Sequence, residues 1–451
     1  MCRKSWRVLL RRGPGGRVAV WLRVLLTLGP FAAEGCTTAP ADEPVLEDGS
    51  SEGRGAAAGG ADGAASPTLD AAIGTSSPPG DSAPSDAEPG AKGDDHASAA
   101  DGATAGETGA ADATPPADAG PAAVRFVARV DYTSPMGPRF AWSGSTVLAR
   151  FTGGSIGVRM SGPPTYFDIS IDGALQSTPL LLAAGTTGYP LATNLAPGPH
   201  ELTVYRRNEP GIGVTGDTTY LGLILDPAGG TLLPPSAPSA RRLEIVGDSI
   251  TTGFGDESVN ANCPNELAAQ NYDVAYGAVA ARTVGADLVT IAWTGKGMYR
   301  NSGGDTTNTM PILYGRTLPD LASSTWNFAS WIPDAVVIYL GNNDFGQGDP
   351  GRPYVTAYNT FIARVRANYK NALIICAIGP NLTDPKLSEE RTYVQGIVSA
   401  ENGAGDPNVV FLEMPQPTKA EGTGCGGHPL AATHARMGAA LVAVLQSTLG
   451  W

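Results

Sequence analysis

The sequence predicts a three-layer α/β domain built on a parallel sheet, preceded by an antiparallel β-sandwich. From about residue 123 the chain contains short alternating segments separated by glycine, proline and asparagine. From Leu243 onward, continuous apolar runs alternate with segments of helical periodicity. Such runs are typical of parallel strands that are covered on both faces. We therefore expect the sandwich at residues 123–235 and the α/β domain at residues 236–451.

Short strands with a period of two predict the sandwich. They are expected over VRFVARVDY, STVLARF, SIGVRM, YFDISIDG, HELTVYRR and TYLGLIL. In the fourth of these, Phe167 and Ile169 face one way, whereas Asp168 and Ser170 face the other. The segment PPSAPSARR, Pro234–Arg242, then forms a proline-rich hinge.

Five apolar runs predict the parallel sheet: LEIVG, ADLVTIAW, DAVVIYLG, ALIICAIG and NVVFLEM. Helices are expected between these runs, including one over NYDVAYGAVAARTVG and one over Tyr354–Tyr369. A final helix reaches about Leu449. Strands that alternate with helices in this way favour a three-layer domain.

Charge and composition separate two N-terminal segments from the folded part. Residues 1–36 carry seven Lys or Arg and one Glu, a net +6, followed by the apolar run VAVWLRVLLTLGPFAA, and predict a signal peptide. The run ends at AEGC, which resembles a bacterial lipoprotein cleavage site, so lipidation of Cys36 and simple secretion both remain open. Residues 37–122 carry two basic and sixteen acidic residues and no aromatic residue, which predicts a disordered linker.

The remaining chain, residues 123–451, carries only −5 of the total formal charge of −13. It shows no basic patch that would indicate nucleic acid binding. We therefore expect no nucleic acid partner, and membrane contact only through a lipid at Cys36. The expected location is outside the cytoplasm, at the cell surface, in the periplasm or in the medium, and the expected oligomeric state is a monomer.

Polar or glycine-rich segments follow four of the expected parallel strands. They are VGDSITTGFG with Ser249, TGKG, GNND and CGGHP. Because ligands bind beyond the carboxyl ends of strands in open parallel sheets, these segments should share one edge. A serine hydroxyl is a weak nucleophile that needs a base within hydrogen-bonding reach. His428 lies at this edge, whereas His200 and His434 are expected to be structural.

Acyl transfer also needs donors that face the developing oxyanion. The Ser249 amide, the Gly295 amide and the Asn343 side chain could supply them. Asp248, in contrast, is expected to fix the turn before Ser249 rather than to act as an acid.

The ordered set of motifs resembles carbohydrate esterase family 2, a branch of the SGNH or GDSL-type hydrolases. The resemblance rests on LEIVGDSIT, GKGMYRN, GNND and HPLAATH, with YRRNEPGIG in the sandwich, and covers about residues 123–451. It implies a jelly-roll domain packed on a flavodoxin-like SGNH domain, and removal of acetyl groups from polysaccharides such as xylan. It also implies Ser249 as nucleophile, His428 as base, and Ser249, Gly295 and Asn343 as the oxyanion hole.

One departure from the SGNH pattern concerns the third member of the triad. Many SGNH enzymes have an Asp two or three residues before the histidine, where this chain has Gly426 and Cys425. A main-chain carbonyl could orient the imidazole, an acid could come from elsewhere, or activity could be weak. Two other functions therefore remain open: an SGNH lipase or thioesterase, and a carbohydrate-binding surface lipoprotein that has lost activity.

Further expectations concern substrate contacts, cysteines and cofactors. Phe345, Tyr299 and Trp331 are expected to contact substrate, with ordinary packing as the alternative for Trp331. An exported chain favours a disulfide between Cys263 and Cys425. The sequence contains no HExxH, paired CxxC or Walker motif, so we expect no metal and no cofactor. The expected partner is acetylated polysaccharide.

Overall fold

A computed structural model describes residues 124–211, 216–263 and 266–451. The expected signal peptide (1–36), the expected linker (37–122) and Cys36 lie outside the described residues. In the part of the chain that is described, no helix is both long enough and apolar enough to cross a membrane.

Two antiparallel sheets form the N-terminal part of the described chain. Their strands are β1 (Arg125–Val127), β2 (Arg139–Phe140), β3 (Thr146–Thr152), β4 (Ile156–Ser161), β5 (Thr165–Ile171), β6 (Ala174–Leu175), β7 (Leu180–Leu182), β8 (Gly188–Ala192), β9 (Pro199–Arg206), β10 (Thr218–Leu225) and β11 (Thr231–Leu233). One sheet has the order β1-β3-β9-β5-β6, with β11 paired to β3 and β7 paired to β5. The other has the order β2-β10-β4-β8.

The core of this part lies between the two sheets. Val147 and Phe151 of one sheet and Val158 of the other are buried in the same cluster. Phe167 and Ile169 also belong to it, which confirms the alternation expected for β5. The β-sandwich prediction is therefore confirmed, and the jelly-roll topology stays a prediction.

A five-stranded parallel sheet forms the second part. Its strands are β12 (Arg242–Gly247), β13 (Asp287–Ala292), β14 (Ala335–Tyr339), β15 (Leu373–Ile378) and β16 (Val409–Glu413), in the order β13-β12-β14-β15-β16. The α-helices are α1 (Ser249–Thr252), α2 (Tyr276–Val284), α3 (Met310–Leu313), α4 (Asn342–Gly346), α5 (Gly351–Asn368), α6 (Lys386–Gly403) and α7 (Ala431–Leu449). Short 3-10 helices are η1 (Leu267–Ala269), η2 (Tyr272–Val274), η3 (Phe328–Ser330) and η4 (Cys425–Gly427).

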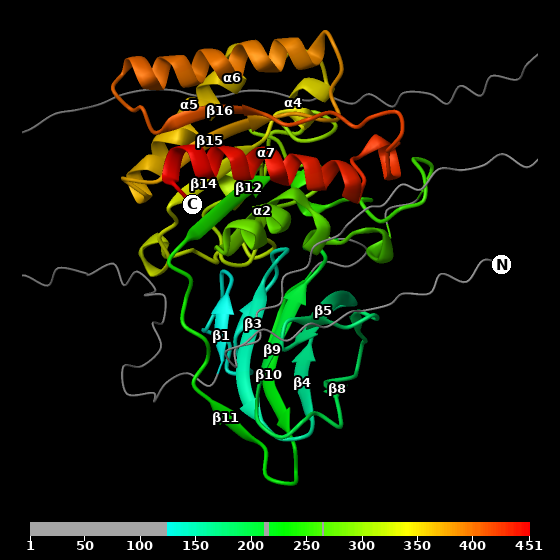
Figure 1. Ribbon diagram of the computed structural model, residues 1–451. Helices are drawn as coiled ribbons and strands as arrows, with labels where there is room; N and C mark the ends of the chain where they lie inside the picture. Colours follow the sequence, from blue (N-terminus) through cyan, green and yellow to red (C-terminus); the bar gives the residue numbers. More distant parts are fainter. Residues whose placement is uncertain (1–123, 212–215, 264–265) are drawn as a thin grey trace, which may run out of the picture. The chain divides into compact units, whose positions relative to one another are not determined.

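Helices cover both faces of this sheet (Figure 1). Ile245 of β12 packs in one cluster with residues of α2 and α7, and its neighbour Val246 packs in another with residues of α5 and α6. Successive side chains of a strand point to opposite faces, so a strand between two helical layers must be apolar throughout. This confirms the predicted three-layer α/β domain.

The strand order places a topological switch point beside β12. The chain moves from β12 to β13 on one side, and the later strands β14, β15 and β16 continue on the other side. Loops that leave β12 and β14 therefore diverge at their carboxyl ends and open a crevice between them. Ser249 follows β12 and Asn343 follows β14, so both lie at this crevice.

Buried polar contacts join the sandwich part to the α/β part. Arg129 donates to Glu244 Oε2 on β12 at 3.2 Å, and both side chains are fully buried. Trp142 Nε1 donates to the Thr317 carbonyl at 2.9 Å. A buried ion pair left without one partner is strongly destabilising, so these contacts hold the two parts in one arrangement.

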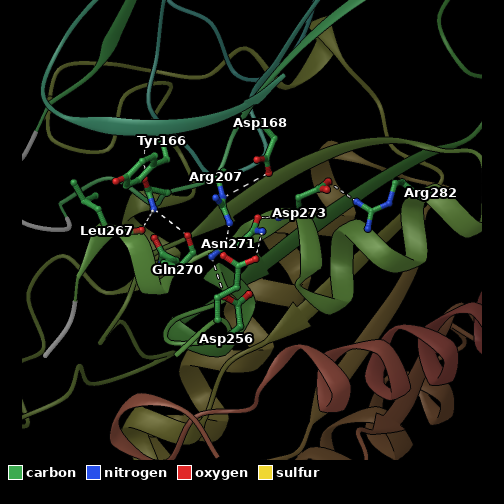
Figure 2. Close-up of polar contacts among 11 residues, drawn as sticks. Tyr166, Asp168, Arg207, Asp256, Leu267, Gln270, Asn271, Asp273 and Arg282 are labelled. Atoms are coloured by element: carbon green, nitrogen blue, oxygen red, sulfur yellow. Dashed lines mark hydrogen bonds and ion pairs between the residues drawn. The ribbon is translucent and has the colours of Figure 1, made fainter. Parts of the chain in front are cut away.

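A second group of polar side chains joins the two parts around Arg207 and Asn271 (Figure 2). Arg207 forms ion pairs with Asp168 of the sandwich and with Glu257 of the α/β part. Glu257 also accepts a hydrogen bond from Asn271 Nδ2 at 2.7 Å. Asp256 accepts from the Asn271 amide at 2.8 Å. The segment around Asn271 is thus fixed against the sandwich.

Candidate active site

Ser249 begins a short helix directly after strand β12. The Asp248 side chain caps this helix, because its Oδ1 accepts from the Ile250 amide at 3.1 Å. Asp248 is fully buried, and burial raises the pKa of its carboxyl to about 7. As the sequence predicted, Asp248 therefore fixes the turn. The Ser249 amide is one of the first N–H groups of a helix, which have no partner within the helix.

His428 lies opposite Ser249 and is correctly oriented to accept its proton. Its Nε2 lies 2.8 Å from Ser249 Oγ, and its Nδ1 lies 2.9 Å from the Cys425 carbonyl oxygen. A carbonyl oxygen can only accept, so Nδ1 carries the hydrogen and the neutral ring presents a lone pair at Nε2. Of the alternatives raised by the missing acid, the structure therefore has a main-chain carbonyl that orients the imidazole.

Burial keeps the His428 imidazole neutral. Desolvation lowers the pKa of His428 to about 4, against the opposing effect of hydrogen bonds to main-chain groups of Cys425 and Gly426. The Phe254 ring packs against the imidazole, with ring centroids 4.4 Å apart. Among the described residues, the ring nitrogens contact the Cys425 carbonyl oxygen and Ser249 Oγ, and neither group is a carboxylate.

A disulfide fixes the residue whose carbonyl orients His428. Cys425 is buried and bonded to Cys263, with a Cα separation of 5.0 Å, which confirms the predicted pairing. Cys376 on β15 is buried and free. The bond ties η4 to the loop after the Ser249 helix, so both sides of the Ser249–His428 pair are held covalently.

Three donors surround the space in front of Ser249. Gly295 follows β13 in the left-handed region, with φ of 78°. In the described part of the chain, neither the Ser249 amide nor the Gly295 amide donates to another group of the protein. Asn343 Nδ2 donates to the Lys296 carbonyl at 2.8 Å and makes a longer contact of 3.4 Å with Asp248 Oδ2, so an oxyanion would have to displace this longer contact to receive a hydrogen from it. The structure thus brings together the three groups expected to form an oxyanion hole.

Asp344, the last residue of GNND, holds the neighbouring loop. Its carboxylate accepts hydrogen bonds of 2.8 Å from three consecutive amides, those of Met298, Tyr299 and Arg300. Arg300 in turn donates to the Asp344 carbonyl. The GKGMYRN and GNND motifs therefore form one unit at the carboxyl ends of β13 and β14.

These groups line a pocket of about 250 Å³. Its lining residues are mainly polar or glycine: Ser249, Thr294, Gly295, Ser302, Asn342, Asn343, Gly346, Asn381, Leu382 and His428. Leu382 is the single apolar side chain among them. The pocket therefore places a small space directly beside the Ser249 hydroxyl and the His428 imidazole.

The three aromatic residues expected to contact substrate do not line this pocket. Phe345 is fully buried against Tyr354, with ring centroids 5.1 Å apart, so that prediction is wrong. Trp331 precedes β14 and therefore lies at the amino end of the strand, away from the edge that carries Ser249. The partly buried Tyr299 packs against the same core cluster as Phe345.

The structure adds pocket residues that the sequence reasoning missed. Asn381 and Leu382 follow β15 and line the pocket beside His428. Their position after a parallel strand was the signal that could have identified them. Ser302, within the loop between β13 and α3, also lines the pocket.

The other two histidines of the folded part have structural partners. His200 in the sandwich contacts Asp172 Oδ2 at 2.7 Å and the Ala196 carbonyl at 2.8 Å. His434 is fully buried in α7 and accepts from the Tyr276 amide at 3.3 Å. Both roles agree with the sequence prediction.

Comparison with known proteins identifies two matched regions. Residues 126–235 match the family described as carbohydrate esterase 2 N-terminal, and residues 245–436 match the GDSL-like lipase/acylhydrolase family. The chain is 36% identical over 330 residues to the cellulase/esterase CelE of Acetivibrio thermocellus. That match covers 73% of this chain and 40% of CelE. The chain is also 26% identical to an acetylxylan esterase / glucomannan deacetylase of Cellvibrio japonicus. This second match covers 70% of this chain and 87% of that protein.

Solved structures show the same relationship. A family two carbohydrate esterase from Clostridium thermocellum, in complex with cellohexaose, is 35% identical, with a TM-score of 0.69. The match covers 73% of this chain and 99% of that one. A carbohydrate esterase family 2 enzyme from Corynascus thermopiles is 31% identical, with a TM-score of 0.63, over 73% and 100% of the two chains. The chain therefore belongs to carbohydrate esterase family 2.

Proposed function

We propose that the protein is a serine esterase that removes O-acetyl groups from a polysaccharide such as xylan. The observation that carries the proposal is the contact of 2.8 Å between Ser249 Oγ and His428 Nε2, in front of a small polar pocket. The Cys425 carbonyl takes the place of a triad acid. Gly295 and Asn343 complete the set of oxyanion donors with the Ser249 amide.

The chemistry follows from this geometry. Ser249 Oγ attacks the acetyl carbonyl carbon while His428 Nε2 takes the hydroxyl proton. The carbonyl oxygen becomes an oxyanion that the three donors stabilise. The bond to the sugar oxygen then breaks, and Nε2–H returns the proton to that oxygen. In the second half, water attacks the acetyl carbon while His428 Nε2 takes one of its protons; the bond from that carbon to Ser249 Oγ then breaks, Nε2–H returns the proton to Oγ, and the acetyl group leaves as acetate.

The acetyl group is the acyl group that fits the pocket. A lipase would need an apolar channel, whereas among the described residues the pocket offers Leu382 as its one apolar side chain. We expect 4-nitrophenyl acetate to be hydrolysed with a kcat/KM at least about 100-fold higher than 4-nitrophenyl octanoate, because a long chain stays in water. Equal values for the two esters would favour the lipase alternative.

A polysaccharide substrate is supported by the relatives. One is named an acetylxylan esterase / glucomannan deacetylase, and another was solved with cellohexaose. We further propose that the chain is exported, as its basic and apolar N-terminus predicts. Export would place the enzyme where polysaccharides occur, and would favour the disulfide beside His428.

The Ser249–His428 pair predicts that the acidic limb of the pH–activity profile lies at low pH. His428 can take a proton only when it is neutral, so activity is lost as the pH falls through its pKa in the folded protein, about 4. We expect titration of His428 to cause no change in kcat/KM for 4-nitrophenyl acetate between about pH 6 and 8. Replacing Gly426 with Asp should move the acidic limb upward, because a carboxylate stabilises the imidazolium.

Gly426 is a suitable position for this test. An added Cβ would lie 3.5 Å from His428 Nδ1, in ordinary contact. The residue has φ of 61°, a conformation that Asp and Asn tolerate better than other side chains. Gly426→Asn is therefore the matched uncharged control. Identical pH profiles for Gly426→Asp and Gly426→Asn would show that a carboxylate adds nothing here.

A further inference from the structure

Glu209 belongs to the sandwich part and contacts two residues of the α/β part, Thr294 and Gln270. It belongs to the YRRNEPGIG segment and is only 2% exposed. Its two carboxyl oxygens accept hydrogen bonds from the Thr294 amide, the Thr294 hydroxyl and Gln270 Nε2. The distances are 2.5, 2.5 and 3.1 Å. A buried carboxyl group that accepts from three donors fixes the position of each donor.

The first consequence concerns the peptide that carries the Gly295 amide. Glu209 holds Thr294 by both its amide and its hydroxyl, on the side before this peptide. On the side after it, the Ser302 amide donates to the Gly295 carbonyl at 2.7 Å. The Thr294–Gly295 peptide is therefore held from both ends beside the pocket, and among the described residues no hydrogen bond is made by its N–H.

The second consequence concerns the helix that carries Ser249. Gln270 Nε2, besides its contact with Glu209, donates to Thr252 Oγ1 at 3.0 Å. Thr252 Oγ1 donates to the Ser249 carbonyl at 2.9 Å. Gln270 Oε1 accepts from the Glu209 amide at 2.9 Å, which fixes the orientation of the Gln270 side chain. One chain of hydrogen bonds thus runs from Glu209 to the Ser249 residue.

Gln270 is itself held by the sandwich. Asn208 Nδ2 donates to the Gln270 carbonyl at 3.2 Å and to the Leu267 carbonyl at 2.9 Å. Figure 2 shows Leu267 and Gln270 on this segment, beside Tyr166 of β5. The Tyr166 amide donates to Asn208 Oδ1 at 2.8 Å. The segment that reaches the Ser249 helix is therefore anchored to a strand of the sandwich.

We propose that Glu209 is a positioning residue that sets the distance between the two main-chain oxyanion donors, those of Ser249 and Gly295. Through it the sandwich part completes the active site, although Glu209 touches neither substrate nor reacting atoms. The inference rests on the proposed esterase function. It assigns to the sandwich a role in transition-state stabilisation in addition to any role in binding polysaccharide.

At Glu209, the proposed role requires two oxygens that accept hydrogen bonds. It does not require a negative charge. Burial raises the pKa of Glu209 to about 7, and a protonated carboxyl still accepts through both oxygens because its O–H can donate to Thr294 Oγ1. An amide cannot do this. In Glu209→Gln, the oxygen can accept from the Thr294 amide, but the NH₂ group then faces Gln270 Nε2, and two donors oppose each other.

The test compares wild type with Glu209→Gln on 4-nitrophenyl acetate. We expect kcat to fall about 10- to 100-fold while KM changes less than about threefold, because a small displacement of the donors affects the transition state more than substrate binding. Inhibition by methylboronic acid should weaken in parallel, because its tetrahedral adduct places an oxygen between the same donors. Wild-type kcat and inhibition in Glu209→Gln would overturn the inference.

Two further variants separate positioning from general stability. Glu257→Gln removes a carboxylate from the same interface without contacting Thr294 or Gln270, so its kcat should stay within about twofold of wild type. The exchange Glu209→Gln with Gln270→Glu restores matched donors and acceptors when the new carboxyl is protonated. It should recover most of the lost kcat near pH 6, as coupled neighbours do. An exchange variant no better than Glu209→Gln would contradict the proposed hydrogen-bond chain.

The test remains decisive if Glu209→Gln does not fold. Thr294→Val keeps the amide contact with Glu209, removes the hydroxyl contact and exchanges a hydroxyl for a methyl group in the pocket lining; it should also lower kcat with little change in KM. A wild-type kcat in that variant would overturn the inference. Wild type and Ser249→Ala are measured alongside: an inactive wild type would refute the proposed function, whereas an active wild type with an equally active Glu209→Gln would refute only the role of Glu209.

Discussion

Replacing Ser249 with alanine is expected to lower kcat for 4-nitrophenyl acetate by about four orders of magnitude or more, with the fold unchanged. The substitution removes the nucleophile and leaves only the oxyanion donors. The Ser249 hydroxyl contacts His428 Nε2, and the loss of this single hydrogen bond should hardly alter the melting temperature. Rates measured with high enzyme concentration, together with a melting curve, check both expectations.

His428→Ala should cost about as much as Ser249→Ala, because nucleophile and base act as a unit. The double variant should then be no slower than either single variant. Additive losses in the double variant would mean that the two residues work independently. Substantial activity in Ser249→Ala alone would show that another residue attacks the ester.

Asn343→Ala is expected to lower kcat about 10²- to 10³-fold, the usual cost of one oxyanion donor. Its Nδ2 also donates to the Lys296 carbonyl, so part of the loss reflects a looser loop beside Gly295. KM should change much less than kcat, because the oxyanion forms only as the reaction proceeds. Steady-state kinetics of the purified variant give both constants.

A different division of the loss would contradict this assignment. If Asn343→Ala raised KM and left kcat unchanged, the amide would bind the ground state and transition state equally. Asn343 would then belong to the substrate-binding surface, and the oxyanion would depend on the two main-chain donors alone.

The positions of the candidate site residues at the strand ends could be predicted because a local pattern places them there. Ser249, Gly295 and Asn343 each follow an apolar strand, and parallel strands share one carboxyl edge. His428 was the histidine in the glycine-rich loop at that edge. The same rule also covers Asn381, which follows β15.

Two predicted substrate contacts, Phe345 and Trp331, were wrong because a residue's distance in sequence from a motif does not determine where its side chain lies. Phe345 follows GNND directly, but it lies within helix α4, where each residue turns about 100° from the last, and its ring faces the core. Trp331 comes before β14 rather than after it, so strand direction already placed it at the opposite edge. Adjacency in sequence to a functional motif was a poor guide in both cases.

Two parts of the site leave no local sequence signal. The acceptor that orients His428 is a main-chain carbonyl, which every residue possesses, so Cys425 could not be recognised for it. Glu209 lies 40 positions before Ser249 in a different part of the fold, and its contacts depend on how the sandwich packs on the sheet. Such long-range contacts follow from tertiary structure, which hydrophobic periodicity does not determine.

Acetate release from acetylated xylan is the direct test of the proposed esterase activity on polysaccharide. Purified protein is incubated with the polysaccharide near pH 7, and free acetate is followed by an enzymatic assay, with Ser249→Ala as the matched control. We expect steady release of acetate by wild type and none above background by Ser249→Ala. No release by a folded wild type that still hydrolyses 4-nitrophenyl acetate would contradict xylan as substrate, and no hydrolysis of either ester would contradict the proposed esterase activity itself.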